Sequence, residues 1–107
     1  MKNINIAVAQ FEPKDGDKDY NLSIIEELTQ KAKKKGADVI SFHELSITAY
    51  TFLKNLDREQ IFELAEEIPN DKSCRKLISI SKKYDIPILA GIVERQNDKI
   101  FNTYFCV

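Results

Sequence analysis

The sequence predicts an α/β fold in which a parallel strand–helix–strand unit is followed by further helices and a C-terminal β-hairpin. Two apolar stretches, residues 4–10 and 39–42, flank a segment whose apolar residues recur at helical spacing. A near-continuous apolar run at residues 86–93 is typical of a buried strand. Residues 100–107 are rich in β-branched and aromatic side chains and follow the polar turn 94–99, which indicates a hairpin.

The first unit should begin with a core strand at residues 4–10 and continue through an amphipathic helix to a second strand at Val39. Asp19 or Asn21 can cap this helix, and Gly36 follows it where a left-handed C-cap is expected. The predicted apolar stripe of the helix is Tyr20, Ile24, Ile25, Leu28 and Ala32. Because strand–helix–strand crossovers are right-handed, we expect these two strands to be parallel.

Glu44 is the residue of this unit that calls for an explanation. In open α/β sheets, ligands collect beyond the carboxyl ends of parallel strands, which is where the loop 11–18 and Glu44 both emerge. At the end of an apolar strand we expect this carboxylate to be partly desolvated, as suits a general base near neutral pH. The alternative is a strand-end glutamate that turns outward into water.

Two shorter helices and a glycine complete the predicted fold. Asp57 can cap a short helix, and Asn70 or Asp71 can cap a longer one. Cys74 lies on the apolar stripe of the longer helix, which makes it a small core residue. Gly91 in the following strand permits close packing against a neighbouring segment.

Composition limits the class of partner. The chain has 107 residues, 43% hydrophobic and 31% charged, which is ordinary for one soluble globular domain. Its 16 basic and 17 acidic residues are interspersed, so there is no electrostatic argument for nucleic acid or an anionic membrane as the main partner. Cys74 and Cys106 lie far apart without metal-binding spacing, and a reduced cytoplasmic setting follows as the expectation.

His43 and Glu44 have the residue types of an acid–base pair, but we do not expect their side chains to touch. Neighbouring side chains of an extended strand point to opposite faces, which predicts Glu44 on the face of Phe42 and His43 on the face of Ser41. As the only histidine, His43 cannot form a His-rich zinc site, and we interpret it as a structural histidine with satisfied hydrogen bonds. Cys106 lies inside a strand, which disfavours a cysteine–histidine nucleophile pair.

Four segments, residues 6–10, 36–50, 87–91 and 101–103, follow one another in an order and spacing that resemble the N-terminal part of the nitrilase superfamily, the carbon-nitrogen hydrolases. In this family the second segment usually consists of Gly-Ala-Asp, a strand, Pro-Glu-Leu and Thr-Gly-Tyr. This chain differs at two positions, with His43 in place of the usual proline and Ala49 in place of the usual glycine. If position 49 needs a positive φ, Ala49 adds roughly 1 kcal/mol of strain.

The resemblance implies part of an α-β-β-α sandwich, in which residues 1–107 form a single domain that is the N-terminal portion of a longer carbon-nitrogen hydrolase domain. It implies a Glu-Lys-Cys triad with Glu44 as general base, whose lysine and cysteine lie past Val107. Neither Cys74 nor Cys106 matches the nucleophile. The chain alone is therefore expected to be inactive.

The substrate implied is a small amide, carbamoyl compound or nitrile, attacked at carbon by a cysteine thiolate. The resemblance implies no metal and no organic cofactor, and the usual pairing of family protomers implies a homo-oligomer. The alternative from another functional class is a small non-enzymatic α/β domain that binds a ligand or partner beyond its strand ends.

Overall fold

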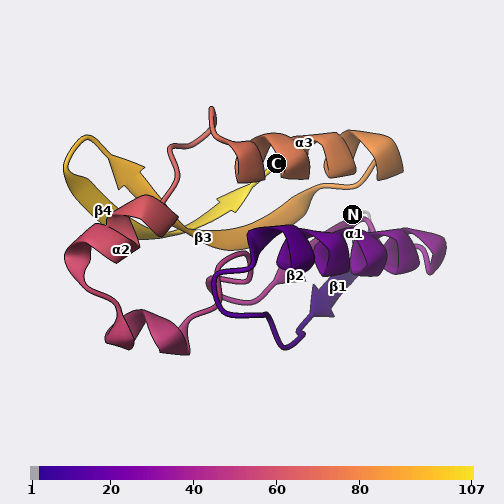
Figure 1. Cartoon of the computed structure of the whole chain (residues 1–107). Helices are drawn as coiled ribbons and strands as arrows, with labels where there is room; N and C mark the ends of the chain where they lie inside the picture. The colour runs from indigo at the N-terminus through magenta and orange to yellow at the C-terminus, as the bar shows by residue number, and fades with distance from the viewer. Residues whose placement is uncertain (1–2) are drawn as a thin grey trace.

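A computed structural model describes residues 3–107 of the chain (Figure 1). Its elements are β1 (Ile6–Ala9), α1 (Lys18–Lys34), β2 (Val39–Phe42), the 3₁₀ helix η1 (Thr51–Asn55), α2 (Arg58–Leu64), α3 (Lys72–Tyr84), β3 (Ile88–Gln96) and β4 (Lys99–Cys106). The strands form one sheet in the order β1-β2-β3-β4, with parallel pairs β1–β2 and β2–β3 and an antiparallel pair β3–β4. The predicted α/β class, the parallel start and the C-terminal hairpin are confirmed.

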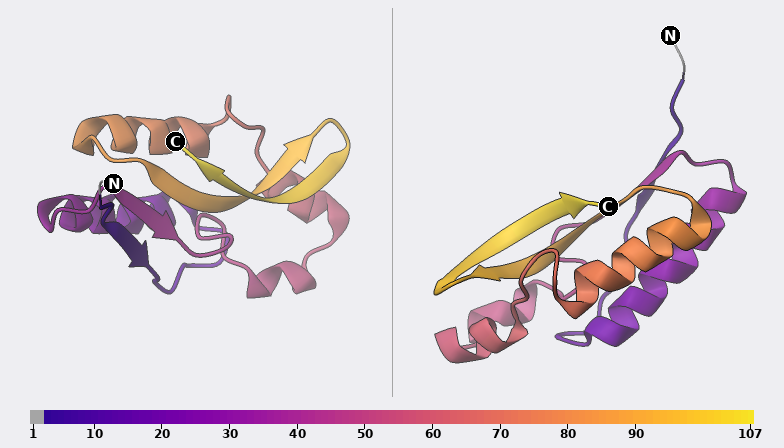
Figure 2. Two further views of the ribbon diagram at one scale, coloured as in Figure 1. Left: turned by 180° about the vertical axis from the view of Figure 1, so that it is seen from behind. Right: turned by 90° about the horizontal axis from the view of Figure 1, so that it is seen from above.

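The core lies between the sheet and the helices α1 and α3, which run side by side on one face of it (Figures 1 and 2). Ile25 of α1 and Leu77 of α3 are fully buried against Ile40, Ile88 and Ile92 of the central strands. Each such side chain contributes about 1.5–3 kcal/mol when it leaves water. This packing fixes β2, and therefore the point where the chain leaves the sheet toward Glu44.

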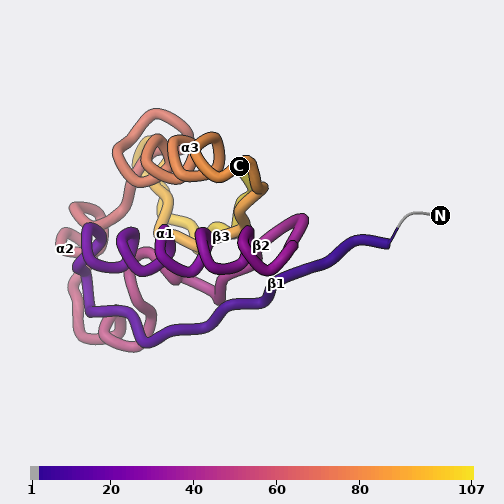
Figure 3. Tube along the Cα trace, turned by 90° about the vertical axis from the view of Figure 1, so that its right-hand side faces the viewer, coloured from indigo at the N-terminus to yellow at the C-terminus, as the bar shows by residue number. Residues whose placement is uncertain are grey.

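The other face of the sheet is uncovered in the described part of the chain. Ile6 and Val8 of β1 are 63% and 83% exposed, and Tyr104 of β4 is 45% exposed. The prediction of a core strand at residues 4–10 is wrong in this respect, because β1 is an edge strand at the border of the molecule (Figure 3). Alternation identifies an apolar face of a strand but not what packs on that face.

The predicted helix starts are right for two of the three α-helices. Asp57 caps α2 in a capping box, and Asp71 is the N-cap residue of α3. The cap of α1 is Asp17, ahead of the predicted Asp19 or Asn21. Within residues 3–107 we find no helix with both the length and the apolar character needed to cross a bilayer.

The hairpin turn is shorter than the polar stretch 94–99 suggested. β3 extends to Gln96, and the turn consists of Asn97 and Asp98. Asn97 has a φ of 58°, which asparagine tolerates and which two-residue hairpin turns require. Polarity alone therefore overestimated the length of the turn, since exposed strand residues are polar as well.

Glu66 holds the beginning of α3. The Asp71 side chain makes no capping hydrogen bond, whereas the buried Glu66 carboxylate accepts from Ser73 N at 2.8 Å and from Ser73 Oγ at 2.5 Å. It also pairs with Lys18 Nζ at 2.8 Å, in the first turn of α1. Burial raises the pKa of Glu66, but the hydrogen bonds from Lys18 and Ser73 outweigh it, so the pKa lies below its usual value.

Replacing Glu66 by glutamine should lower the free energy of unfolding by about 2 kcal/mol at neutral pH, since hydrogen bonds to a charged group are lost. Because the folded-state pKa lies below the usual 4.5, this stabilisation is complete above that pH and disappears as the pH falls through the folded-state pKa. Urea unfolding at neutral and acidic pH measures the effect. Glu67→Gln, at the exposed neighbour, is the matched control, and equal effects of the two substitutions at neutral pH would contradict the assignment.

Candidate functional site

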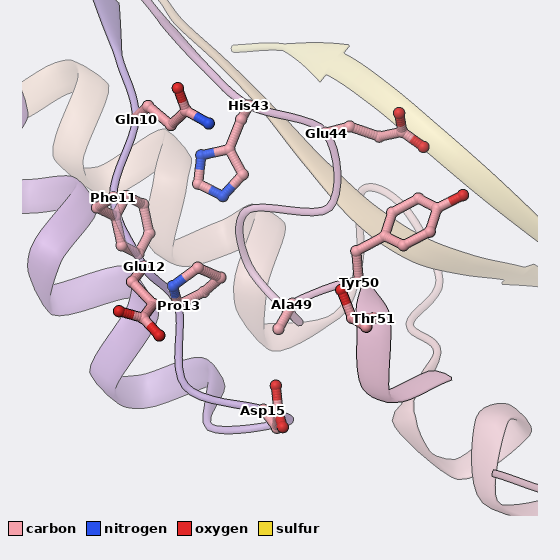
Figure 4. Close-up of a pocket in the computed structure, with 10 residues that line it drawn as sticks. All are labelled: Gln10, Phe11, Glu12, Pro13, Asp15, His43, Glu44, Ala49, Tyr50 and Thr51. Atoms are coloured by element: carbon pink, nitrogen blue, oxygen red, sulfur yellow. The ribbon is translucent and has the colours of Figure 1, made fainter. Parts of the chain in front are cut away.

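The carboxyl ends of β1 and β2 open into a pocket of ≈ 750 Å³ (Figure 4). The loop after β1 and the loop after β2 form its walls, so the expectation that these two segments meet at one edge of the sheet is confirmed. The lining residues are Gln10, Phe11, Glu12, Pro13, Asp15, His43, Glu44, Ala49, Tyr50 and Thr51.

The loop behind Glu44, residues 45–49, is buried along its whole length. A buried loop needs partners for its backbone polar groups, and Asn21 supplies one. The Asn21 Nδ2 donates to Ile47 O at 2.8 Å and to Lys14 O at 2.9 Å, while its Oδ1 accepts from Lys14 N at 2.8 Å. One fully buried amide thus ties α1 to both walls of the pocket. The sequence suggested Asn21 only as a possible cap.

Gly91 lets this loop pass against β3. A Cβ on Gly91 would collide with the backbone nitrogen of Leu45 and would lie 3.3 Å from the carbonyl carbon of Glu44. Ile47 N donates to Gly91 O at 3.1 Å, and Gly91 N donates to Ser46 Oγ at 3.4 Å. The predicted close packing at Gly91 is confirmed, and its neighbour is the segment that carries Glu44.

Two side chains of β4 reach across the sheet to the end of β2. Asn102 Nδ2 donates to Glu44 Oε1 at 2.5 Å. Tyr104 OH donates to Phe42 O at 2.6 Å and lies 2.7 Å from Ser41 Oγ. The partial desolvation expected of Glu44 is not found in residues 3–107, where its side chain is exposed because the adjacent sheet face is uncovered. Sequence reasoning noted Asn102 within a motif but assigned it no contact.

His43 and Glu44 diverge, although not by the predicted alternation. β2 ends at Phe42, so neither residue continues the strand. Through its bond to β4, Glu44 lies on the side of Ser41 rather than of Phe42, while His43 packs edge-on against Phe11, with ring centroids 5.1 Å apart. The prediction is wrong because alternation requires an extended backbone.

His43 is also not the satisfied structural histidine that the sequence suggested. Both of its ring nitrogens are buried, and neither has a hydrogen-bond partner within residues 3–107. Burial lowers the pKa of His43, which keeps the imidazole neutral at pH 7. A neutral imidazole offers one donor and one acceptor, and here both are unused.

The loop backbone is strained at two positions. Leu45 and Ala49 have φ values of 50° and 73°, in the left-handed region that disfavours residues with a Cβ. A hydrogen bond of 2.9 Å from Ala49 N to Leu45 O closes the turn between them. The condition under which Ala49 adds strain, a positive φ at position 49, is therefore met.

The two cysteines take no part in this pocket. Cys74 is buried and Cys106 is exposed, and both are free thiols. Burial raises the pKa of the Cys74 thiol, in keeping with the predicted small core residue. Within the described ranges, no three histidine, cysteine, aspartate or glutamate side chains lie together closely enough to hold a metal ion.

Comparison with known proteins adds four similarities. The sequence profile of one family, carbon-nitrogen hydrolase, matches residues 5–107. A nitrilase from Pyrococcus abyssi is 31% identical over 100 residues, which cover 94% of this chain and 37% of the nitrilase. The fold is similar to that of a glutamine-dependent NAD⁺ synthetase from Acinetobacter baumannii, with a TM-score of 0.77 and 29% identity over 100% of this chain and 19% of the synthetase.

An amidase from Nesterenkonia sp. also shares the fold, with a TM-score of 0.72 and 18% identity over 97% of this chain and 38% of the amidase. The chain thus spans well under half the length of each of these relatives.

Replacing Ala49 by glycine should raise the free energy of unfolding by up to about 1 kcal/mol, because glycine adopts a positive φ without strain. Urea or thermal unfolding measures the change. Ala90→Gly, at a buried position of β3, is the matched control and should destabilise the chain by about 1 kcal/mol. Equal losses at the two positions would show that the Ala49 backbone stores no strain.

Proposed function

This chain belongs to the carbon-nitrogen hydrolase family, and we propose that it supplies the general base, Glu44, for hydrolysis of a C–N bond in a small amide, carbamoyl compound or nitrile. The observation that carries the proposal is the location of Glu44 in the wall of the pocket at the carboxyl ends of β1 and β2. The buried loop, Gly91 and Asn102 hold it there. Such support is typical of a side chain whose orientation matters.

The chemistry follows from what a carboxylate in this position can do. Glu44 accepts the proton of a cysteine thiol, and the thiolate attacks the amide or nitrile carbon. Glu44 returns this proton to the leaving nitrogen, so that ammonia or an amine departs, and the carboxylate then deprotonates the water that releases the acid from the acyl-enzyme. In this proposal the lysine and cysteine of the triad lie past Val107, as the family resemblance implies. Neither Cys74 nor Cys106 lines the pocket.

The uncovered sheet face has a place in the same proposal. Its exposed apolar residues, Ile6, Val8 and Tyr104, form the surface on which the remaining layers of an α-β-β-α sandwich would pack. Asn102 and Glu44 lie on this side of the sheet. Packing there would remove water from around Glu44 and provide the desolvation that a general base near neutral pH requires.

The 107-residue chain alone should release no ammonia from a panel of amides, carbamoyl compounds and nitriles, because two residues of the proposed triad are absent. In the product of the complete open reading frame, Glu44→Gln should lower kcat/KM about a thousandfold and leave the fold intact, since glutamine cannot accept the proton. Ammonia release and circular dichroism measure the two effects.

The control is Glu63→Gln, an exposed carboxylate of α2 outside the pocket, which should retain activity. If the Glu44→Gln protein retained wild-type turnover, Glu44 would have a structural role and not a catalytic one. A stop codon directly after Val107 would favour the rival, a non-enzymatic α/β domain that binds a ligand or partner.

Two further properties belong to the proposal. We expect the complete protein to be a homo-oligomer, as the family resemblance implies, and sedimentation velocity tests this. A monodisperse monomer would contradict it. We also propose a cytoplasmic setting, which the two free thiols, Cys74 and Cys106, support.

A further inference from the structure

The direction of the Glu44 carboxylate depends on one side-chain contact in the described part of the chain. The buried loop and Gly91 fix the backbone at Glu44, but several rotatable bonds separate that backbone from the carboxylate. Its Oε1 accepts from Asn102 Nδ2 at 2.5 Å, and within residues 3–107 Glu44 takes part in no ion pair. A long exposed side chain without such a contact samples several rotamers. Asn102 therefore selects one orientation of the carboxylate.

Asn102 is itself held in place by the hairpin. It lies within β4 opposite Val93, in the continuous pairing of β3 with β4. Two residues further along the same face of the strand, Tyr104 OH donates to Phe42 O at 2.6 Å. Two side chains of β4 thus reach over β3, one to the last carbonyl of β2 and one to Glu44. A residue on such a rigid element is suited to orienting another side chain.

The chemistry of this pair leaves Glu44 Oε2 for proton transfer. An ionised carboxylate only accepts hydrogen bonds, so Asn102 must present its NH₂ group to it. Oε2 has no hydrogen-bond partner in the part of the chain that the structure describes, and the side chain extends on the side of the pocket where Tyr50 lies (Figure 4). The neutral amide neither takes up a proton nor supplies a charge. Because a carboxylate offers about four acceptor positions, the lysine of the proposed triad can approach it without displacing Asn102.

We propose that Asn102 is the positioning residue of Glu44. Its amide holds Oε1, so that Oε2 accepts the proton of the cysteine thiol, returns it to the leaving nitrogen and then accepts a proton from water. Packing on the uncovered sheet face, as in the proposed function, removes the water that competes for the amide and strengthens this hydrogen bond. The inference rests on the proposed function, because it assigns a partner to the proposed general base.

Replacing Asn102 by leucine in the complete protein tests the proposal, since leucine has a similar shape but no donor. Both kcat and kcat/KM should fall about 10- to 100-fold with little change in KM, because a misplaced base weakens only the transition states. Asn102→Asp, which also lacks the NH₂ group, should lose at least as much and replaces the leucine variant if that protein fails to fold. Asn102→Gln keeps the NH₂ group and should recover part of the activity. Ammonia release measures these rates.

Thr103→Val is the matched control. Thr103 follows Asn102 in β4, and its Oγ1 donates to Glu94 Oε1 at 2.6 Å. The substitution therefore removes a hydrogen bond to a carboxylate from the same strand, but Glu94 does not line the pocket. Thr103→Val should retain activity, and urea unfolding compares its stability with that of Asn102→Leu. Equal losses of kcat in the two variants would show that both act through the stability of the hairpin, and would overturn the proposal.

A double variant shows whether Asn102 acts through Glu44. In the Glu44→Gln protein, Asn102→Leu should cause no further loss of the residual activity, because the base that it orients is already absent. A further loss of about tenfold or more would overturn the inference. A rise in KM at unchanged kcat in the single Asn102→Leu protein would overturn it as well, because Asn102 would then act on substrate binding.

The same set of proteins distinguishes failure of this inference from failure of the proposed function. Wild-type turnover by Glu44→Gln, or no turnover by the complete wild-type protein, would overturn the proposed function and the inference with it. Loss of turnover in Glu44→Gln together with full kcat in Asn102→Leu would overturn the inference alone and leave the proposed function intact.

Discussion

The absence of a side chain at Gly91 is the constraint on which the geometry of this site depends. The backbone of Leu45 occupies the space that a Cβ at Gly91 would take. Tyr104 pairs with Gly91 across the hairpin, and its hydroxyl reaches past this point to Phe42 O. The close approach of Leu45 to Gly91 and the hydrogen bond from Tyr104 to Phe42 both fix the position of the chain at the end of β2. Glu44 is the first side chain after β2 that is exposed, and its direction follows from these contacts.

The buried loop converts this constraint into a defined backbone path. Two of its residues, Leu45 and Ala49, adopt left-handed conformations that a free peptide would avoid. Such conformations persist only where the surroundings determine them, and the buried amide of Asn21 and the backbone of Gly91 provide those surroundings. The cost in conformational energy is local. Its consequence is a rigid support for Glu44 at the edge of an open sheet.

The order of elements could be predicted from the sequence because it depends on local patterns. Helical spacing, the left-handed Gly36 and the small Gly91 are properties of short segments. The contact between Glu44 and Asn102 joins residues 58 positions apart, and the role of Asn21 depends on two loops that meet only in the fold. No local pattern encodes such contacts. For the same reason, the exposure of β1 could not be deduced from its alternation.

The two adjacent residues His43 and Glu44 acquire different properties because the chain turns between β2 and the buried loop. Glu44 extends toward β4 and water, whereas the His43 ring packs against Phe11 and its two nitrogens are shielded from water. That burial lowers the pKa of His43 and so favours the neutral imidazole. The charge of this ring matters because the pocket lining is acidic. A charged imidazole would itself neutralise the nearby carboxylates. A neutral one does not, so the burial of one ring leaves the lining formed by the described residues acidic.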